Sequence, residues 1–454
     1  MTKFKHIAFH WPYLGLGGVE RVEVLLAKMF HDEFNMDVSF FCESEIHGSA
    51  KAWVPDFVDI VHFESTEQLI ELLRLRRIDI YYEHFAHGLW YKDYNNVFEQ
   101  IVTIKSELNL PCLFHMHSFV GEMANWGKFS EAATFLRNSQ DYVVTLTTVD
   151  ETLLQCLGIK AKYIPNPVDD SINLCKASTR DSKGIVWVGR ADVKKNPIDA
   201  IKIFKEVLRQ EPTARLTMAL AGADDAAFRM RKHLKIIAKE CGVLDAVDFI
   251  YDSFDVGKLY GRSSVFLCTS DFEGFPMTFI EAAANALPVI MYRLDNVEMA
   301  RNNKGVFSVQ KGDVEGAANA IVHLFRDDNS YRIASAANAC KFAEICSYDR
   351  SAAYRSILSH IAVQKCTQQD LGKSCISEAI LLYLKQSENW AEAEKEKYRD
   401  TFTPFIGIFR TLRHLFQLVR CRVWSIRCES ILNWLRKGGS LLSKQEINIK
   451  ATVI

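Results

Sequence analysis

The sequence predicts an α/β protein made of two doubly wound, Rossmann-like domains. Short apolar runs of strand length alternate with amphipathic segments of helix length, a pattern typical of βα units on a parallel sheet. Residues 169–183 are polar and lack periodicity, and they divide the runs into two series. We therefore predict one domain over 1–168, a linker over 169–183 and a second domain over 184–362. Residues 363–454 are expected to form a helical extension.

The first series begins with an apolar run that ends in the glycine-rich segment P-Y-L-G-L-G-G. An amphipathic helix over Val19–Phe30 is expected directly after it. Further runs rich in β-branched and aromatic residues follow at intervals that leave room for helices. The expected strands are His6–Trp11, Val38–Cys42, Ile78–Tyr82, Cys112–His115, Tyr142–Leu146 and Tyr163–Pro165.

The second series repeats the same alternation after the linker. Helical periodicity is clearest over Pro197–Arg209, Ala226–Cys241 and Met277–Ala286. Two successive domains of this kind place a cleft between the facing edges of their sheets. The expected strands are Gly184–Val188, Arg215–Ala221, Val247–Tyr251, Val265–Thr269 and Val289–Tyr292.

Composition excludes several classes of protein. The 454 residues carry a net charge of −1, so the whole chain has no global attraction to nucleic acid or to anionic membranes. The 12 cysteines are scattered without a C-x-x-C pair, which favours reduced thiols over disulfides or zinc. The N-terminus lacks the pattern of a signal peptide, and no apolar run of about 18 residues is present in the sequence. We therefore expect a cytoplasmic protein without nucleic-acid partners.

Two glutamates, Glu273 and Glu281, are the most informative residues of the chain. They stand eight positions apart in E-G-F-P-M-T-F-I-E, the first on a loop after a strand and the second inside the following helix. Ligands of open α/β sheets bind at this edge, and a helix start offers free N–H groups to phosphate. Carboxylates beside a phosphate seat predict a ligand with both hydroxyls and phosphate, such as a nucleotide sugar.

Further motifs resemble the retaining glycosyltransferases of family 4, which have the GT-B fold. The resemblance covers roughly residues 5–360 and depends on the order and spacing of the motifs together. It implies a nucleotide-sugar-binding second domain and a first domain on the acceptor side. Besides the two glutamates, the motifs are G-G-V-E-R-V at Gly17–Val22, I-P-N-P-V-D at Ile164–Asp169, V-G-R-A-D-V-K-K-N at Val188–Asn196 and S-Y-D-R-S-A-A-Y at Ser347–Tyr354.

Two cations follow the first strand of the second domain. Fixed positive charges there can neutralise a diphosphate leaving group, although an exposed Arg and Lys are by themselves more often only solvated. With the resemblance, Arg190 and Lys195 are implied to contact the donor diphosphate. Since the sequence has no D-x-D triplet, we expect these residues and helix N-termini to take the place of a metal, and we expect no cofactor.

The resemblance also assigns roles to the glutamates and to their neighbours. Glu281 is implied to accept hydrogen bonds from the ribose hydroxyls, and Glu273 to hold the transferred sugar or to stabilise developing positive charge. The intervening backbone is implied to turn toward the donor, with Pro276 at the first helical position, where its missing N–H costs little. The donor-binding candidates are therefore Glu281, Gly274, Phe275, Pro276 and Met277, together with Gly17 and Gly18 of the first glycine-rich loop.

Histidines follow two strands of the first domain. His117 resembles a family histidine that reaches the donor, but His115 lies on the same strand face and is an alternative. A metal site there is disfavoured because no third ligand is near in the sequence. Glu83 and His84, after the strand Ile78–Tyr82, are candidates for the acceptor side.

The C-terminal extension carries a basic amphipathic segment over 405–437, with seven Arg or Lys residues against the single acid Glu429. Such a helix can lie on an anionic membrane surface, or it can pack across the two domains with its arginines solvated. Both readings stay open from the sequence. The first would place the protein on the inner face of the cell membrane.

The sequence thus predicts a retaining, metal-independent glycosyltransferase that moves a hexosyl unit from a nucleotide diphosphate sugar, with UDP favoured over GDP. The acceptor is expected to be a saccharide or a lipid-linked glycan, in the biosynthesis of a bacterial cell-surface polysaccharide such as lipopolysaccharide. Alternatives on the same fold are a nucleotide-sugar epimerase, a phosphorylase or a non-catalytic sugar-binding protein.

Overall fold

The computed structural model of the chain consists of two compact units, Met1–Glu388 and Asn389–Ile454. All described residues belong to the first unit. The predicted extension from residue 365 onward, with its basic segment over 405–437, lies outside them, and its role stays a prediction. The structure describes residues 4–10, 18–43, 51–84, 95–117, 120, 129–139, 141–169, 183–222, 225–251, 255–271 and 273–364.

The first half of the described chain is a seven-stranded sheet in the order β3-β2-β1-β4-β5-β6-β7, and all its pairs are parallel. The helices in this half are α1 (Gly18–Phe34), α3 (Thr66–Leu75), α4 (Asn95–Leu108), α6 (Phe129–Ser139) and α7 (Thr148–Cys156). The strands are β1 (His6–His10), β2 (Asp37–Cys42), β3 (Asp59–His62), β4 (Ile80–Glu83), β5 (Cys112–His115), β6 (Tyr142–Thr145) and β7 (Lys160–Tyr163).

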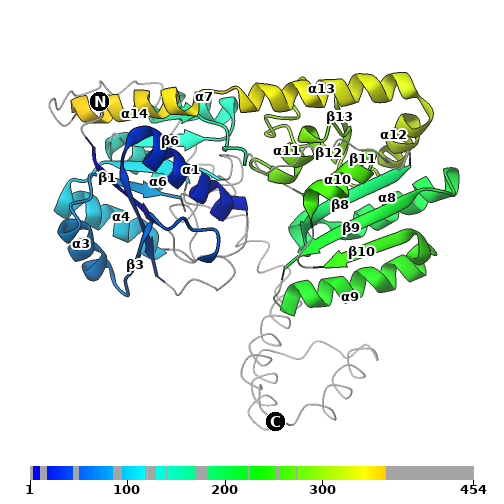
Figure 1. Ribbon diagram of the computed structural model, residues 1–454, viewed down its shortest axis with the longest axis horizontal. Helices are drawn as coiled ribbons and strands as arrows, with labels where there is room; N and C mark the ends of the chain where they lie inside the picture. The colour runs from blue at the N-terminus through cyan, green and yellow to red at the C-terminus, as the bar shows by residue number, and fades with distance from the viewer. Residues whose placement is uncertain are drawn as a thin grey trace, which may run out of the picture. The chain divides into compact units, whose positions relative to one another are not determined.

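The second half is a separate six-stranded parallel sheet in the order β10-β9-β8-β11-β12-β13 (Figure 1). The helices are α8 (Pro197–Gln210), α9 (Asp225–Glu240), α10 (Val256–Arg262), α11 (Met277–Ala284), α12 (Val314–Arg326) and α13 (Asp328–Cys346), with short 3-10 turns η3 (Val193–Lys195) and η4 (Leu244–Ala246). The strands are β8 (Gly184–Arg190), β9 (Arg215–Ala221), β10 (Val247–Tyr251), β11 (Val265–Cys268), β12 (Val289–Tyr292) and β13 (Val306–Val309).

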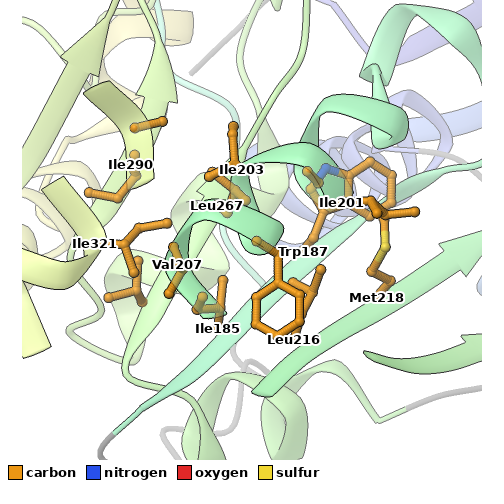
Figure 2. Packing of buried hydrophobic residues seen from close by; sticks show 14 of the residues in the cluster. Ile185, Trp187, Ile201, Ile203, Val207, Leu216, Met218, Leu267, Ile290 and Ile321 are labelled. Atoms are coloured by element: carbon orange, nitrogen blue, oxygen red, sulfur yellow. The ribbon is translucent and has the colours of Figure 1, made fainter. Parts of the chain in front are cut away.

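Each sheet has an apolar core on both faces, because alternate residues of a strand point to opposite sides. On β8, Ile185 and Trp187 pack with α8 and α12 on one face, as Figure 2 shows. Val186 of the same strand packs on the other face with residues of α10 and α11. The same alternation separates Ala8 from Ile7 and Phe9 on β1. The continuous apolar runs predicted from the sequence are therefore central strands covered on both sides.

The strand order reverses direction at one place in each sheet, between β1 and β4 and between β8 and β11. Loops that leave these neighbouring strands run to opposite faces, so a crevice opens at the carboxyl edge of the sheet. The first crevice lies beside the ends of β1 and β4, at His10 and Glu83. The second lies beside the ends of β8 and β11, where Arg190 and the loop before Glu273 are found.

The last described helix, α14 (Arg350–Gln364), packs against the first half rather than the second. Its Tyr354 and Leu358 are buried in the core that contains Phe9 and Phe30, and the Tyr354 hydroxyl lies 2.6 Å from that of Tyr82. In Figure 1 α14 accordingly runs along the first half, while α13 covers the second. The sequence had placed residues 350–362 in the second domain, because periodicity does not show which core a helix joins.

The predicted elements differ from the observed ones mainly at the sheet edges. The sequence analysis missed β3 and β13 and placed β7 about two residues too late, at Tyr163–Pro165. All three are edge strands with mixed burial, so they lack the apolar run that marks a central strand. The central strands match the predicted ranges within about two residues.

Asn338 of α13 ties that helix to the second sheet. It is fully buried, and its amide donates to the carbonyl oxygens of Leu287 at 2.6 Å and Gly305 at 3.0 Å. Its Oδ1 accepts from Asn303 Nδ2 at 2.8 Å. A buried polar side chain with all these partners fixes the position of α13 over β12 and β13.

Replacing Asn338 with alanine removes these bonds and leaves a small cavity. We expect the free energy of unfolding to fall by about 1–3 kcal/mol, as measured by urea denaturation. Arg332→Ala, an exposed change on the same helix, is the control and should stay within about 0.5 kcal/mol of the unmodified protein. Equal stability of the two variants would contradict this role of Asn338.

Candidate active site

A hydrogen-bond chain anchors the turn after β8 to the end of β11. The indole N–H of Trp187 donates to Thr269 Oγ1 at 3.0 Å. The Thr269 hydroxyl in turn faces the carbonyl oxygens of Lys195 at 3.0 Å and Asn196 at 2.8 Å. Asn196 has a left-handed backbone, with φ 46°, which ends η3 and starts α8. This chain therefore fixes the position of Lys195 over the crevice.

Lys195 and Glu273, which the sequence assigned to different tasks, form one ion pair. Lys195 Nζ lies 2.6 Å from Glu273 Oε1, and Ser270 Oγ donates to the same oxygen at 2.6 Å. The Asn296 amide holds the Glu273 carbonyl oxygen at 2.5 Å. Since Glu273 is buried, the pair is shielded from water on most sides, and its charges interact more strongly than at a surface.

Arg190 is the last residue of β8, one position earlier than the loop in which the sequence placed it. Its side chain is 63% exposed, and it pairs with Asp192 at 3.1 Å. Asp192 also caps η3 by accepting from the Lys195 N–H at 3.1 Å. Arg190 is thus a largely solvated cation at the rim, whereas Lys195 is the partner of the buried Glu273.

Glu281 lies in the second turn of α11 and is only 9% exposed. Burial raises its pKa to about 7, although Arg21 and a hydrogen bond from Tyr260 act in the opposite direction. The Tyr260 hydroxyl donates to Oε2 at 3.3 Å, and Arg21 NH1 lies 3.5 Å from Oε1. Among the described residues these are the two side-chain donors to the carboxylate, which keeps accepting capacity for a ligand.

Arg21 is a site residue that the sequence analysis did not identify. It comes from α1 of the first half, 260 positions before Glu281, and it also binds Asp169 Oδ2 at 3.0 Å through NH2 and 3.2 Å through Nε. The motif G-G-V-E-R-V contains it, but only the glycines were used in the interpretation. A lone arginine on a helix gives no signal of its own, so its role depends on the pairing of the two halves.

The starts of α1 and α11 lie against each other. A Cβ atom built on Gly18 would stand 3.4 Å from Met277 Cγ, and the Asn166 amide reaches Met277 Sδ at 4.0 Å. Gly18 and Met277, both predicted to line the donor site, are therefore in contact range. Gly17 lies outside the described residues.

The loop before α11 has the predicted form with one correction. Pro276 is the residue before the first helical position, with φ −69° and no side-chain cap on the helix. The sequence placed it one position later, inside the helix. Phe275 is buried and Gly274 is partly exposed, so the backbone from Gly274 to Met277 leads into an uncapped helix start. Such a start offers N–H groups to an anion.

On the first half, Glu83 forms a buried ion pair instead of standing free for an acceptor. Its Oε2 lies 2.6 Å from His10 Nδ1, and both side chains are fully buried. Burial lowers the pKa of His10, but the charge of Glu83 and bonds to Glu83 and Glu43 outweigh this and raise it to about 9. The crevice between β1 and β4 therefore has a fixed charge pair at its base.

Three histidines gather beside this pair. One ring nitrogen of each of His84, His115 and His117 lies within 4.8 Å of one nitrogen of each of the other two. Burial lowers the pKa of His84 and His115 well below the usual value, and neighbouring histidines add to the effect. The sequence disfavoured a metal here for want of a third ligand near His115 and His117. The fold brings His84 to that place.

A polar cavity of about 480 Å³ lies at the carboxyl edge of β2 and β3 in the first half. Carboxylates, hydroxyls and one aromatic ring line it, which are groups that bind sugar hydroxyls and the apolar face of a sugar ring. The lining residues are Glu43, Phe63, Glu64, Ser65, Thr66, Glu67, Glu99 and Gln100.

Comparison with known families and proteins relates the chain to glycosyltransferases. Residues 176–339 match the family described as Glycosyl transferases group 1. An uncharacterized glycosyltransferase of Haemophilus influenzae is 23% identical over 349 residues, which are 72% of this chain and 92% of that protein. The mannosylfructose-phosphate synthase of Agrobacterium fabrum is 28% identical over 34% of this chain and 38% of its own length.

Solved structures share the fold. The Anabaena protein HepE, in complex with UDP-glucose, has a TM-score of 0.62 at 17% identity, over 79% of this chain and 99% of that one. The pneumococcal O-GlcNAc transferase GtfA, in complex with UDP and GlcNAc, has a TM-score of 0.63 at 12% identity, over 79% and 99% of the two chains. The fold is therefore GT-B, as predicted, and together with the family match it supports a glycosyltransferase.

The raised pKa of Glu281 predicts how stability depends on pH. A carboxyl group whose pKa moves from 4.5 to about 7 on folding binds more protons in the folded state between these values. Its contribution to the free energy of unfolding therefore decreases as the pH rises from about 4.5 to about 7. We expect Glu281→Gln to gain stability relative to the unmodified protein across this window, as measured by urea denaturation at several pH values.

Glu344→Gln, an exposed change in the same half, is the control and should show no such gain. A constant stability difference between Glu281→Gln and the unmodified protein at all pH values would show that the carboxyl group titrates normally.

Proposed function

We propose that the protein is a retaining glycosyltransferase of family 4 that transfers a hexosyl unit from a nucleotide diphosphate sugar. The observation that carries the proposal is the convergence of the Lys195–Glu273 pair and the buried Glu281 on one sheet edge, with Arg21 and Gly18 reaching it from the other half. A cleft with residues from both halves is what a reaction between donor and acceptor requires.

Glu281 is proposed to bind the ribose of the donor. Its buried carboxylate has one neighbouring hydroxyl, from Tyr260, and one guanidinium, from Arg21. The two vicinal hydroxyls of a ribose can each donate a hydrogen bond to the Glu281 carboxylate in place of water. These hydrogen bonds favour the ionised form of the carboxylate. Arg21 supplies a countercharge, so the ionised carboxylate is not left alone in the protein interior.

Lys195 and Arg190 are proposed to neutralise the diphosphate. Lys195 already shares its charge with Glu273, so an incoming diphosphate would compete with that carboxylate for the ammonium group. Glu273 would then be available to the hydroxyls of the sugar or to the developing positive charge at the anomeric carbon. The exposed Arg190 can swing to the phosphates, and the start of α11 adds backbone N–H groups.

The chemistry proposed is a front-face displacement. The bond between the anomeric carbon and the phosphate oxygen breaks, and a bond to the acceptor oxygen forms on the same face. The acceptor proton passes to the departing phosphate, so no protein nucleophile is needed and the configuration is retained. His117 is proposed to hold the donor sugar or phosphate, and the protein mainly orients the substrates and stabilises charge.

Two observations support the choice of substrates. Structures that share this fold contain UDP-glucose in one case, and UDP with GlcNAc in another, which favours a UDP-sugar donor. The polar cavity lined by Phe63 and several glutamates suits a saccharide acceptor.

We further propose that this acceptor is lipid-linked and belongs to a cell-surface polysaccharide, with the segment 405–437 at the inner face of the membrane. No helix among the described residues is long and apolar enough to cross a membrane.

Removing the charge of Lys195 should depress transfer more than it affects folding. We expect Lys195→Met to lower the rate of nucleotide release by about 100-fold or more, because the departing diphosphate loses a positioned cation. Lys195→Arg should retain part of the rate. Lys202→Met, which breaks an exposed pair with Asp199, is the matched control. Full activity of Lys195→Met on a panel of nucleotide sugars would contradict the assignment of the donor site.

A front-face mechanism without a metal at the diphosphate predicts both the product and its conditions. We expect the enzyme to work at an unchanged rate in excess EDTA and to give a product with the anomeric configuration of the donor, as read by proton NMR. A product of inverted configuration would refute the retaining mechanism, and loss of turnover in EDTA would refute metal independence. Conversion of donor without acceptor would identify an epimerase instead.

A further inference from the structure

We propose that His84, His115 and His117 form a binding site for one divalent metal ion of the zinc class, at the carboxyl edge of β4 and β5. This site lies apart from Lys195 and Glu281 of the second half. It shares His117 with the proposed donor contact, but the proposed transfer reaction does not require the ion. Its evidence is the arrangement of the three imidazoles and of the oxygen atoms behind them.

The backbone places the three rings at one spot. His115 ends β5, and His117 follows two positions later on the same side of the chain. β4 pairs with β5 so that Glu83 stands opposite Phe114, which brings His84 level with His115. A histidine at a strand end, a second two positions later and a third directly after the neighbouring strand supply three ligands from one sheet edge.

The ligand atoms are close enough for coordination after a small side-chain movement. His117 Nε2 lies 3.5 Å from His84 Nδ1, and the donor set lies within 4.8 Å. Nitrogen ligands at about 2.0–2.1 Å from a tetrahedral zinc ion stand about 3.4 Å apart. Side-chain rotations of about 1 Å therefore close the set around an ion.

A second-shell oxygen already holds the His115 ring in the form that metal ligands adopt. His115 Nδ1 lies 3.3 Å from the Tyr82 hydroxyl. Metal-bound histidines usually make such a bond with the nitrogen that does not bind the metal, so the bond directs His115 Nε2 to the ion. On the His84 ring, the nitrogen that faces His117 is Nδ1, and the buried carboxylate of Glu23 lies 3.4 Å from it, so Glu23 places a negative charge beside the ion.

The second nitrogen of His115 has no partner in the described part of the chain. His115 Nε2 is buried and accepts or donates no hydrogen bond among the described residues. A buried polar atom without a partner is costly, and such an atom beside two further imidazoles points to a ligand. A cation with an affinity for neutral imidazole satisfies it. Three protein ligands leave a fourth position for water or for an oxygen of a substrate.

The test is a zinc titration of the full-length, donor-free protein by isothermal titration calorimetry. Exposed thiols such as Cys156 and Cys340 are alkylated first, because free cysteines also bind zinc. We expect one equivalent of zinc to bind, and His84→Asn and His117→Asn each to weaken binding at least tenfold. Glu23→Gln should weaken it about tenfold or more, because it removes the negative charge beside the His84 ligand nitrogen. His323→Asn, an exposed change on α12, is the control.

Cobalt gives a second measurement that does not depend on a buried variant folding. Cobalt held by three imidazoles in a four-coordinate site gives an intense visible spectrum, whereas adventitious six-coordinate binding at the surface gives a weak one. Unchanged zinc affinity in His84→Asn and His117→Asn, or a weak cobalt spectrum, would overturn the site. Lys195→Met separates this proposal from the proposed transferase, because it should lower the rate of transfer by about 100-fold or more and leave zinc binding intact.

Discussion

The arrangement of the candidate site depends on one constraint, which is that parallel strands all end at the same edge of their sheet. In both sheets the order of strands reverses once, beside β1 and β4 and beside β8 and β11. The residues that end these strands or follow them, such as His10, Glu83, Arg190 and Glu273, therefore meet at two crevices. Nothing in their local sequence would otherwise bring them together.

The buried charged side chains at this edge are each paired with a side chain of opposite charge. Lys195 and Glu273 balance each other, His10 and Glu83 do so at the base of the first half, and Glu281 has Arg21 as its partner. Charges buried in this way are costly to separate but ready to exchange partners with a ligand of matching charge. A diphosphate carrying a ribose has the groups to do this at Lys195 and Glu281. The paired state without ligand and the proposed donor-bound state thus use the same side chains.

Side-chain contacts and the return of the chain to the first half both connect the two halves. Arg21 extends from α1 to Glu281 and Asp169, and Arg350 donates to the carbonyl oxygens of Pro165 and Asn166 beside the connection between the halves. After α13 the chain returns to the first half as α14, whose apolar side completes that core. The site is therefore built from side chains whose positions depend on both sheets.

The sequence by itself determined the two parallel sheets, their central strands and the motif residues of the second half. Strong apolar runs and local turn chemistry encode these features within a few residues. Only the tertiary structure decided the Arg21–Glu281 pair, the joining of Lys195 to Glu273, the approach of His84 to His115 and the place of α14. Weakly apolar edge strands such as β3 and β13 also needed the sheet to define them. The reason is that contacts between residues far apart in sequence leave no periodic signal, since they arise from the way the strands are ordered.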